Sequence, residues 1–395
     1  CRVLKRLKRN LEGLGMSEWR EFRLEDFVDI HNQIRIPLSK MERSKKQGIY
    51  PYYGASGVID CVDDYLFDGE FVLVSEDGEN LKSRKTPIAF KASGKFWVNN
   101  HAHIIKGKKG FHNNLIIYYL QNLDLHEYIT GAVQPKLNKA NLLSIPLCLP
   151  EDENEQKAIA EVLSSLDDKI DLLHSQNKTL EQMAETLFRQ WFVEEAQEDW
   201  EEGVLDDILT VKGGTTPSTK NPNFWKGKIH WTTPKDLSKN SPLFLMNTLR
   251  KITKAGLENI SSGLLPKGTL LLSSRAPVGY LAFAEIPLAI NQGYIAIIDN
   301  KGFSKTFIYL WLRINMDYVK SHANGSTFQE ISKTSFKALK IILPPKRLQI
   351  RFDETVNDNF KKIRSNLHQV RSLENLRNTL LPKLMSGEIR VASNG

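Results

Sequence analysis

The residue types that could support catalysis do not occur at the spacings that catalysis needs. No stretch matches the G-x-x-x-x-G-K-[ST] loop that cradles nucleotide phosphates. The tetrad at 221–224, Asn-Pro-Asn-Phe, is one residue away from the Asn-Pro-Pro-aromatic tetrad of adenine methyltransferases, but no F-x-G-x-G cofactor loop precedes it. His101 and His103 could place two metal ligands on one strand face, yet no third ligand is evident. We therefore predict neither a catalytic residue nor a bound metal.

Two other groups of residues are typical of DNA contact. The first group joins closely spaced basic residues to tyrosines, namely Lys40, Arg43, Lys45, Lys46, Tyr50, Tyr52 and Tyr53. Basic side chains anchor a protein on phosphates, and side chains with hydroxyl groups can reach base edges. We predict that this segment is a basic loop that contacts DNA. The alternative is a solvated loop with a structural turn.

The second group lies at the matching place in the second half of the chain, on and after the glycine-rich stretch 213–220. It combines hydroxyl groups and lysines, namely Thr215, Thr216, Ser218, Lys220, Lys226, Lys228, Thr232 and Lys235. These residues suit readout of a DNA groove. Arg275 is a further candidate for DNA contact.

Charge is distributed unevenly between the two halves of the chain. The 395 residues include 54 Lys and Arg against 46 Asp and Glu, a net charge of +8. Residues 203–345 carry 18 basic and 8 acidic side chains, net +10, whereas residues 16–150 carry 17 and 16, net +1. The second segment therefore has the stronger electrostatic signature for phosphate contact.

The second half of the chain repeats the first. Short strand-like runs alternate with turn-rich loops in each copy, and each copy has one aromatic-apolar helix, at 115–123 and 307–315, which we predict to lie in a core. The matching stretches are LEDF and LDDI at 24–27 and 205–208, GEFVLVSEDGENL and GTLLLSSRAPVGYL at 69–81 and 268–281, and LNKANLLSIPLCLP and ISKTSFKALKIILP at 137–150 and 331–344. Two copies of a unit this long indicate two domains related by pseudo-symmetry.

Each copy ends in a long helical stretch with a heptad seam. Seam residues alternate at spacings of four and three from Ile159 to Trp191, and the same phase recurs 193 residues later, from Phe352 to Leu384. We predict that the two helices pair through Leu163, Leu166, Ile170, Leu173, Leu180, Leu187, Val356, Ile363, Val370, Leu373, Leu380 and Leu384. The alternative is that each helix packs separately against its own domain.

The two helical segments carry opposite charges. Residues 151–202 have 4 basic and 16 acidic side chains, net −12, and residues 346–390 have 10 and 5, net +5. Opposite charges favour pairing of the two helices with each other, in antiparallel orientation. About 38 residues make a rod of roughly 57 Å. Pro382 is expected to kink the second helix or end its regular part, and Gly387 is a plausible stop.

These observations predict an α+β chain in which two long antiparallel coiled-coil helices separate two pseudo-symmetric mixed α/β domains. The predicted segments are a basic tail at 1–15, a first domain at 16–150, a helical spacer at 151–202, a second domain at 203–345 and a second helical spacer at 346–395. The tail is either a basic arm or non-native sequence ahead of Met16.

Cysteine usage and hydropathy suggest a compartment. Cys1, Cys61 and Cys148 include no C-x-x-C pair and cannot form a disulfide framework, which fits a reducing cytoplasm. No run of 18 or more apolar residues is present, so we expect no membrane partner.

Several stretches resemble one family in combination. The helical stretches at 155–193 and 373–391 are similar to those of Type I restriction-modification specificity subunits. YPYYGASGVIDCVDDYLFDGEFVLVSEDGENL, WVNNHAHII, GGTTPSTKNPNFW and INQGYIAI resemble the target-recognition domains of that family. The resemblance covers residues 16 to about 391.

The resemblance implies a non-catalytic subunit that reads double-stranded DNA. Each target-recognition domain would read one half of a bipartite asymmetric sequence, and the helix pair would set the spacer between the halves. Two modification (methyltransferase) subunits and two restriction subunits, which are ATP-dependent nucleases, would complete the complex. S-adenosylmethionine, ATP and Mg²⁺ would belong to those partners, and this chain would bind no cofactor.

Two other classes of function stay open at this point. One is a stand-alone double-domain DNA-binding regulator without enzymatic partners, which a stable complex with a methyltransferase subunit would exclude. The other is a methyltransferase or nuclease with a degenerate motif. Failure of the purified chain to bind S-adenosylmethionine would exclude the methyltransferase form.

Overall fold

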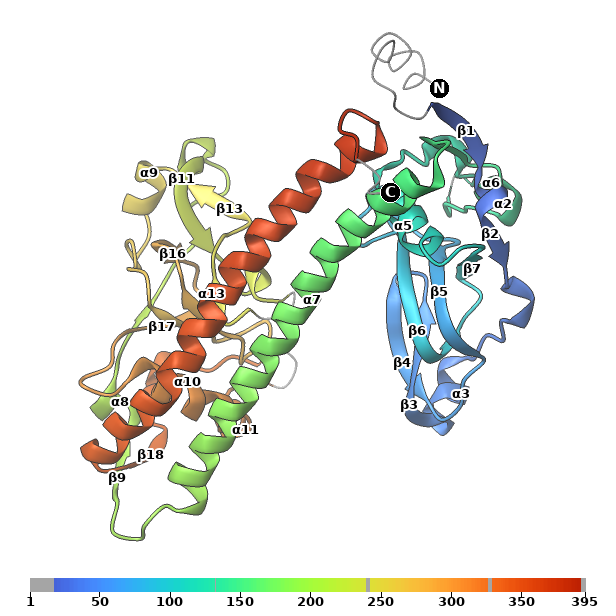
Figure 1. Ribbon diagram of the computed structural model, residues 1–395. Coiled ribbons are helices and arrows are strands. Elements are labelled where there is room, and N and C mark those ends of the chain that lie inside the picture. Colours follow the sequence, from blue (N-terminus) through green and yellow to red (C-terminus); the bar gives the residue numbers. More distant parts are fainter. Residues whose placement is uncertain (1–17, 132, 239–241, 326–328, 392–395) are drawn as a thin grey trace. The chain divides into compact units, whose positions relative to one another are not determined.

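The computed structural model describes residues 18–131, 133–238, 242–325 and 329–391, so the predicted basic tail at 1–15 lies outside the described residues. The chain divides into two compact units, residues 1–171 with 370–395 and residues 172–369. Each unit contains one mixed α/β domain and a part of each long helix (Figure 1).

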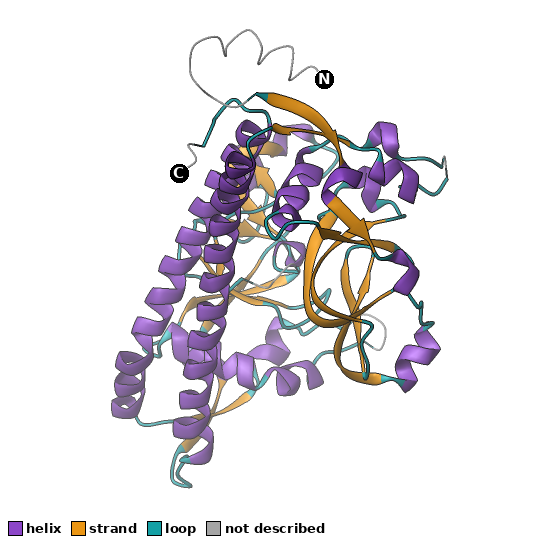
Figure 2. Ribbon diagram, turned by 45° about the vertical axis from the view of Figure 1, so that its right-hand side comes forward, coloured by secondary structure: helices purple, strands orange, loops and turns teal. Residues whose placement is uncertain are grey.

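The first domain is built on a six-stranded sheet of order β2-β7-β5-β6-β3-β4, whose strands are orange in Figure 2. The sheet is antiparallel except between β3 and β6, and a separate pair joins the first and last strands, β1 and β8. The strands are β1 Trp19–Arg23, β2 Val28–Ile30, β3 Gln47–Gly54, β4 Gly57–Val62, β5 Phe67–Ser75, β6 Ala89–Val98, β7 Ala102–Gly107 and β8 Pro146–Pro150.

The helix α5 contacts β5, β6 and β7 of this sheet. Its side chains Leu115, Ile116 and Tyr118 are buried, which confirms the predicted core helix of the first domain. The helices and helical turns are α2 Leu24–Phe27, η1 Asn32–Ile34, α3 Lys40–Lys45, α4 Asn80–Ser83, α5 His112–Asn122, η2 His126–Tyr128 and α6 Lys139–Leu143.

The second domain divides its strands between a five-stranded sheet, β10-β17-β14-β15-β12, and a three-stranded sheet, β13-β11-β16, with a separate β9-β18 pair. The strands are β9 Glu201–Val204, β10 Thr210–Gly213, β11 Trp225–Thr232, β12 Phe244–Leu245, β13 Arg250–Ile252, β14 Leu270–Ser273, β15 Leu281–Ala284, β16 Leu288–Ile290, β17 Tyr294–Asp299 and β18 Lys340–Leu343. The helices and helical turns are α8 Leu205–Ile208, η4 Pro222–Phe224, η5 Pro234–Asp236, α9 Lys254–Glu258, α10 Lys305–Ile314, α11 Met316–Ser321 and α12 Lys333–Lys337.

The two domains share the pairing of their end strands and of their middle three strands, as the sequence repeat predicts. In each, the first strand pairs antiparallel with the last, β1 with β8 and β9 with β18. The repeated LEDF and LDDI segments form the same one-turn helix after that first strand, α2 and α8. The middle three strands also pair alike, since β5 lies between β7 and β6 and β14 lies between β17 and β15.

The two long helices are α7 Glu153–Arg189, which continues as a π-helical turn over Gln190–Glu194, and α13 Lys346–Met385. They are antiparallel within the second unit, because Asn177 bonds to Asn366 whereas Phe188, eleven residues later on α7, packs on Phe352, fourteen residues earlier on α13. In the first unit, Asp167 of α7 forms an ion pair with Arg377 of α13. The predicted antiparallel pair of oppositely charged helices is therefore present.

All twelve residues of the predicted seam are at least partly shielded from solvent. Among the twelve predicted interface residues, Leu163, Ile170, Leu173, Val356, Ile363, Val370 and Leu384 are buried, and the other five are half-buried. Aromatic side chains outside the seam attach the helices to the second domain, since Phe188 lies 5.2 Å from Phe307 and Phe360 lies 5.9 Å from Tyr309 between ring centroids. The helices therefore pair with each other and also pack on a domain.

The expected ends of α13 differ in one point from the structure. The helix continues three residues past Pro382 to Met385, so the prolyl ring does not end it there. Gly387 follows with a φ of +70°, the left-handed conformation of a helix stop, as predicted. No helix in the described part of the chain is long and apolar enough to cross a membrane.

Candidate nucleic-acid interface

The predicted basic group of the first domain begins on a short helix, α3, and not on the predicted loop. Ser39 caps this helix: its hydroxyl accepts from the backbone N–H of Glu42 at 3.2 Å, and the Glu42 carboxylate accepts from the backbone N–H of Ser39 at 2.7 Å. These hydrogen bonds lower the pKa of Glu42. This reciprocal box presents Lys40 and Lys45 to solvent.

Arg43 and Tyr52 make contacts inside the first domain. The Arg43 guanidinium donates to Asp60 at 2.9 Å and to the Leu38 carbonyl at 2.7 Å, and this pairing lowers the pKa of Asp60. Tyr52 is 1% exposed, and its hydroxyl accepts from the Leu38 N–H at 2.9 Å. The prediction that Tyr52 contacts DNA is wrong, and Arg43 has a structural role in place of the predicted one.

The other tyrosines and lysines of this group are partly or fully accessible. Tyr53 is half-buried against Phe96, at 5.5 Å between ring centroids, and burial raises its pKa. Tyr50 lies 5.1 Å from Tyr65, and the ammonium of Lys95 lies 4.5 Å above the ring of Tyr65. Lys95 was not in the predicted group. As DNA contacts, Lys40, Lys45, Lys46, Tyr50 and Tyr53 stay predictions.

His103, one of the two histidines considered as possible metal ligands, is held by hydrogen bonds inside the first domain. His103 is buried, and its ring nitrogens pair with Asn32 at 2.8 Å and with the Leu137 carbonyl at 2.7 Å. Burial lowers the pKa of His103. Burial opposes ionisation of the neighbouring Glu76, but Arg35, at 2.6 Å, and the other nearby cations outweigh it, so the pKa of Glu76 is lowered. Among the described residues, no group of three or more His, Cys, Asp or Glu is placed to hold a metal ion.

In the second domain, the glycine-rich stretch is fixed by two tryptophans of β11. The indole N–H of Trp225 donates to the Ser218 carbonyl at 3.1 Å, and that of Trp231 donates to the Thr215 carbonyl at 3.4 Å. A Cβ on Gly214 would lie 2.0 Å from the carbonyl oxygen of Ile290, so the close approach of this loop to β16 requires glycine.

Thr232 does not belong to the accessible group. It is fully buried, and its hydroxyl lies 3.3 Å from the Asp236 carboxylate and 3.3 Å from the Tyr294 hydroxyl. The prediction of Thr232 as a DNA contact is therefore wrong. Thr216 is exposed and donates to Gln292 at 2.7 Å, and Arg275 pairs with Glu330 at 3.4 Å. Their roles toward DNA stay predictions.

The remaining predicted lysines of the second domain, Lys220, Lys226, Lys228 and Lys235, are exposed, and none forms an ion pair with another described residue. The strand β13, paired with β11, adds two exposed cations that the sequence reasoning missed, Arg250 and Lys251. They lie at a hollow of about 380 Å³ that is also lined by Trp225 and Lys226. The short R-K pair gave no periodic or motif signal that would have singled it out.

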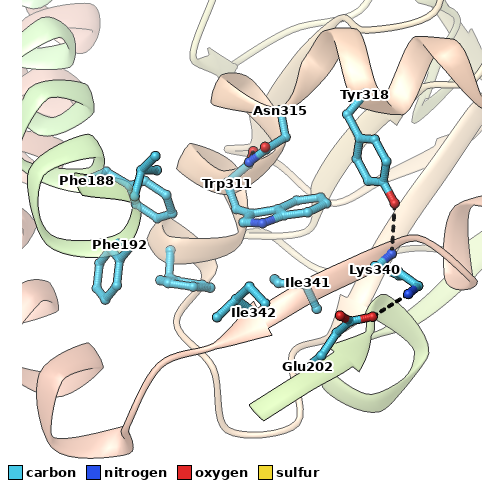
Figure 3. A pocket seen from close by; sticks show the side chains of 11 residues that line it. Phe188, Phe192, Glu202, Trp311, Asn315, Tyr318, Lys340, Ile341 and Ile342 are labelled. Atoms are coloured by element: carbon cyan, nitrogen blue, oxygen red, sulfur yellow. Dashed lines mark hydrogen bonds and ion pairs between the residues drawn. The ribbon is translucent and has the colours of Figure 1, made fainter. Parts of the chain in front are cut away.

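A second hollow, of about 330 Å³, lies where α7 ends against α10 and β18 of the same unit (Figure 3). Its lining is mainly aromatic and aliphatic, including Phe188, Phe192 and Trp311, with one ion pair of Lys340 and Glu202 at 2.5 Å. The buried aromatic side chains of α10 confirm the predicted core helix at 307–315. This lining is unlike the lysine-rich surface around β11.

Comparisons with known proteins agree with this geometry. A type I restriction enzyme specificity subunit of Methanocaldococcus jannaschii is 38% identical over 162 residues, which is 40% of this chain and 38% of that relative. A Haemophilus influenzae protein, provisionally named as another such subunit, is 28% identical over 375 residues, 91% of each chain. A crystal structure of the S subunit of a Type-I restriction-modification system from M. genitalium shares the fold, with a TM-score of 0.60 at 17% identity over 95% of this chain and 98% of that one.

The family model for the Type I restriction modification DNA specificity domain matches twice, over residues 16–182 and 197–370. Each match covers one α/β domain and continues into the long helix that follows it, to residue 182 of α7 and to residue 370 of α13. The chain therefore belongs to the family of Type I restriction-modification DNA specificity subunits.

Proposed function

We propose that this chain is the DNA-recognition subunit of a Type I restriction-modification complex. Each α/β domain reads one half of a bipartite asymmetric site, and the helix pair sets the length of the unread spacer. The observation that carries this proposal is the duplication: the same domain occurs twice, and each copy packs with a part of an antiparallel helix pair.

The length of the helices supports a role in spacing. The 37 residues of α7 correspond to about 55 Å at 1.5 Å per residue. One turn of DNA spans about 34–36 Å, so a rod of this length is sufficient to bridge major-groove sites one turn apart. The exposed lysines around β11 support phosphate contact by the second domain.

Catalysis is assigned to partner subunits. Two methyltransferase subunits and two ATP-dependent nuclease subunits complete the complex, and they bind S-adenosylmethionine, ATP and Mg²⁺. This chain acts without a catalytic centre, in the cytoplasm where the DNA lies. The acidic segment 151–202 faces cationic protein and stays away from DNA, because its net charge of −12 repels phosphate.

Single-molecule sequencing for N6-methyladenine tests the proposal. In cells that carry this chain with its methyltransferase partner, we expect one motif with two specific halves, an unspecific spacer and one methylated adenine in each half. Absence of any such motif, together with failure of the chain to bind a methyltransferase subunit, would leave the stand-alone regulator as the better explanation.

A further inference from the structure

Arg250, the first residue of β13, is held against an aromatic platform. Its guanidinium carbon lies 3.5 Å from the ring centroid of Trp225 and 5.4 Å from that of Trp231. The two indoles contact each other edge to face at 5.1 Å, and both are anchored by hydrogen bonds to the glycine-rich loop. Stacking on a fixed ring restricts the guanidinium to one plane, so little side-chain entropy remains to be lost on binding.

The donors of this guanidinium are available. Arg250 is exposed, and within the described part of the chain its side chain forms no hydrogen bond and no ion pair. Arg43 of the first domain, which lies 5.0 Å above the ring of Tyr52, provides the contrast, because Asp60 and the Leu38 carbonyl already occupy its donors. An arginine that is fixed by stacking but has no hydrogen-bond partner is prepared to bind an external acceptor.

The backbone of β11 and β13 is irregular next to Trp225 and Arg250. The pairing of β11 with β13 shifts register between Trp225 and Ile229, which is where a bulge re-aims side chains. Lys226 within this bulge has a φ of +61°, a strained conformation for a residue other than glycine. A Cβ on Gly227 would lie 2.2 Å from the Ile252 carbonyl, so only glycine lets the two strands approach here.

We propose that Arg250 reads a guanine in the half-site bound by the second recognition domain, and that Trp225 is its positioning residue. The inference rests on the DNA-recognition function proposed above. A planar guanidinium donates two parallel hydrogen bonds to the O6 and N7 atoms of guanine in the major groove. A phosphate contact needs a positive charge but no fixed plane, and the exposed lysines nearby already supply that charge.

The test combines the full-length chain, in complex with its methyltransferase partner, with altered DNA. The wild-type protein is titrated with the methylated site and with duplexes in which each guanine of the site is replaced in turn by 7-deazaguanine, which lacks the N7 acceptor. The variants Arg250→Ala, Arg250→Lys and Trp225→Leu are titrated with the same duplexes. Lys251→Ala is the matched control, because it removes the same charge one residue away.

We expect one 7-deazaguanine to weaken wild-type binding by roughly 10-fold, and Arg250→Ala to lose affinity for the native site by about 10- to 100-fold while becoming insensitive to that replacement. Arg250→Lys and Trp225→Leu should lose the same discrimination, whereas Lys251→Ala should keep it. The wild-type protein with modified DNA gives an answer even if a variant fails to fold.

A uniform loss of affinity on all duplexes with Arg250→Ala, with a salt dependence reduced by about one phosphate contact, would overturn the proposal. Wild-type affinity that responds to none of the 7-deazaguanine positions would also overturn it. A wild-type complex that binds all sequences equally would instead contradict the proposed DNA-recognition function itself.

Discussion

At the scale of single residues, burial separates the side chains that stabilise the first domain from those that are available to DNA. Tyr52 and Tyr50 lie two positions apart on β3, and the first is buried whereas the second is half-exposed. The Tyr52 hydroxyl satisfies the backbone of Leu38, so its removal leaves a partly buried N–H without a partner.

Tyr52→Phe is therefore expected to destabilise the first domain by about 1–2 kcal/mol, with no change in the recognised DNA sequence. Denaturant unfolding measures the first quantity and methylation sequencing the second. Tyr50→Phe is the control, expected to leave stability within about 0.5 kcal/mol. A changed half-site in the Tyr52→Phe variant would show that Tyr52 contributes to DNA recognition after all.

His103 and His112 make the first domain sensitive to acid. The pKa of each in the folded chain lies below the ordinary value of 6.5 because the ring is buried. Above pH 6.5 each ring is neutral whether the chain is folded or unfolded, but as the pH falls below 6.5 the unfolded chain binds the proton first, and the domain loses stability. The carboxylate of Glu76 adds to this loss only below its ordinary value of 4.5.

Hydrogen exchange of the full chain between pH 7.5 and 5, corrected for the intrinsic rate, measures this loss domain by domain. Peptides from β5 and β7 should lose protection, whereas peptides from β14 and β17 should not, because Tyr294 replaces His103 in the second domain. Equal loss in both domains would contradict the assignment to the buried histidines of the first domain.

Charge and glycine content could be interpreted from the sequence, whereas the burial of single side chains could not. Lysine clusters and glycine-rich loops could be predicted from the sequence, because charged residues usually lie on surfaces and glycine often lies in turns. The burial of Tyr52 and Thr232 could not be predicted, because it depends on strands that are distant in the sequence. Tyr52 pairs with β6, and Thr232 pairs with β16. Arg250 was missed because its significance comes from two tryptophans 25 and 19 residues earlier that only the fold brings beneath it.

At the scale of elements, the heptad seam between the long helices contains one buried pair of asparagines. Asn366 donates to Asn177 at 2.8 Å, and both side chains are buried. Polar pairs at seam positions specify register and lower stability. The heptad spacing predicted the seam from the sequence, but the partner of each asparagine depends on the register of the pair, which spacing alone leaves open.

Asn177→Leu alone should destabilise the helix pair by about 1–3 kcal/mol, because it leaves the Asn366 amide buried without a partner. The double variant Asn177→Leu, Asn366→Leu should recover that loss or exceed the wild-type stability. A double-mutant cycle by denaturant unfolding measures the coupling. Additive losses in the double variant would show that the two amides do not act as a pair.

The acidic surface of α7 belongs to the same scale. Glu161, Asp168 and Asp171 are exposed on this helix. Replacing the three by amides should weaken assembly with the methyltransferase subunit roughly tenfold, since three charges contribute about 0.5 kcal/mol each. Quantitative pull-down measures this affinity, with Lys346, Arg347 and Lys362 of α13 replaced by Gln as the control. Unaltered assembly in the acidic variant would contradict a protein-facing role.

At the scale of the whole molecule, duplication explains why one chain can recognise an asymmetric site. Two copies of one domain have diverged in charge, +1 against +10, while keeping the pairing of their end strands and of their middle three strands. The sequence repeat predicted this organisation correctly, because repeated turns and strands survive divergence of the loops. The bases that each domain reads depend on loop side chains, which have diverged most between the copies.

The length of the unread spacer depends directly on the length of the helix pair. Deleting one heptad from each helix, residues 172–178 and 365–371, removes Asn177 and Asn366 together and shortens the pair by about 10 Å, or three base pairs. Single-molecule sequencing of N6-methyladenine in cells with this variant should show the same two half-sites separated by a spacer about three base pairs shorter. Methylation of both half-sites at the original spacing would contradict the claim that the helices measure the distance between them.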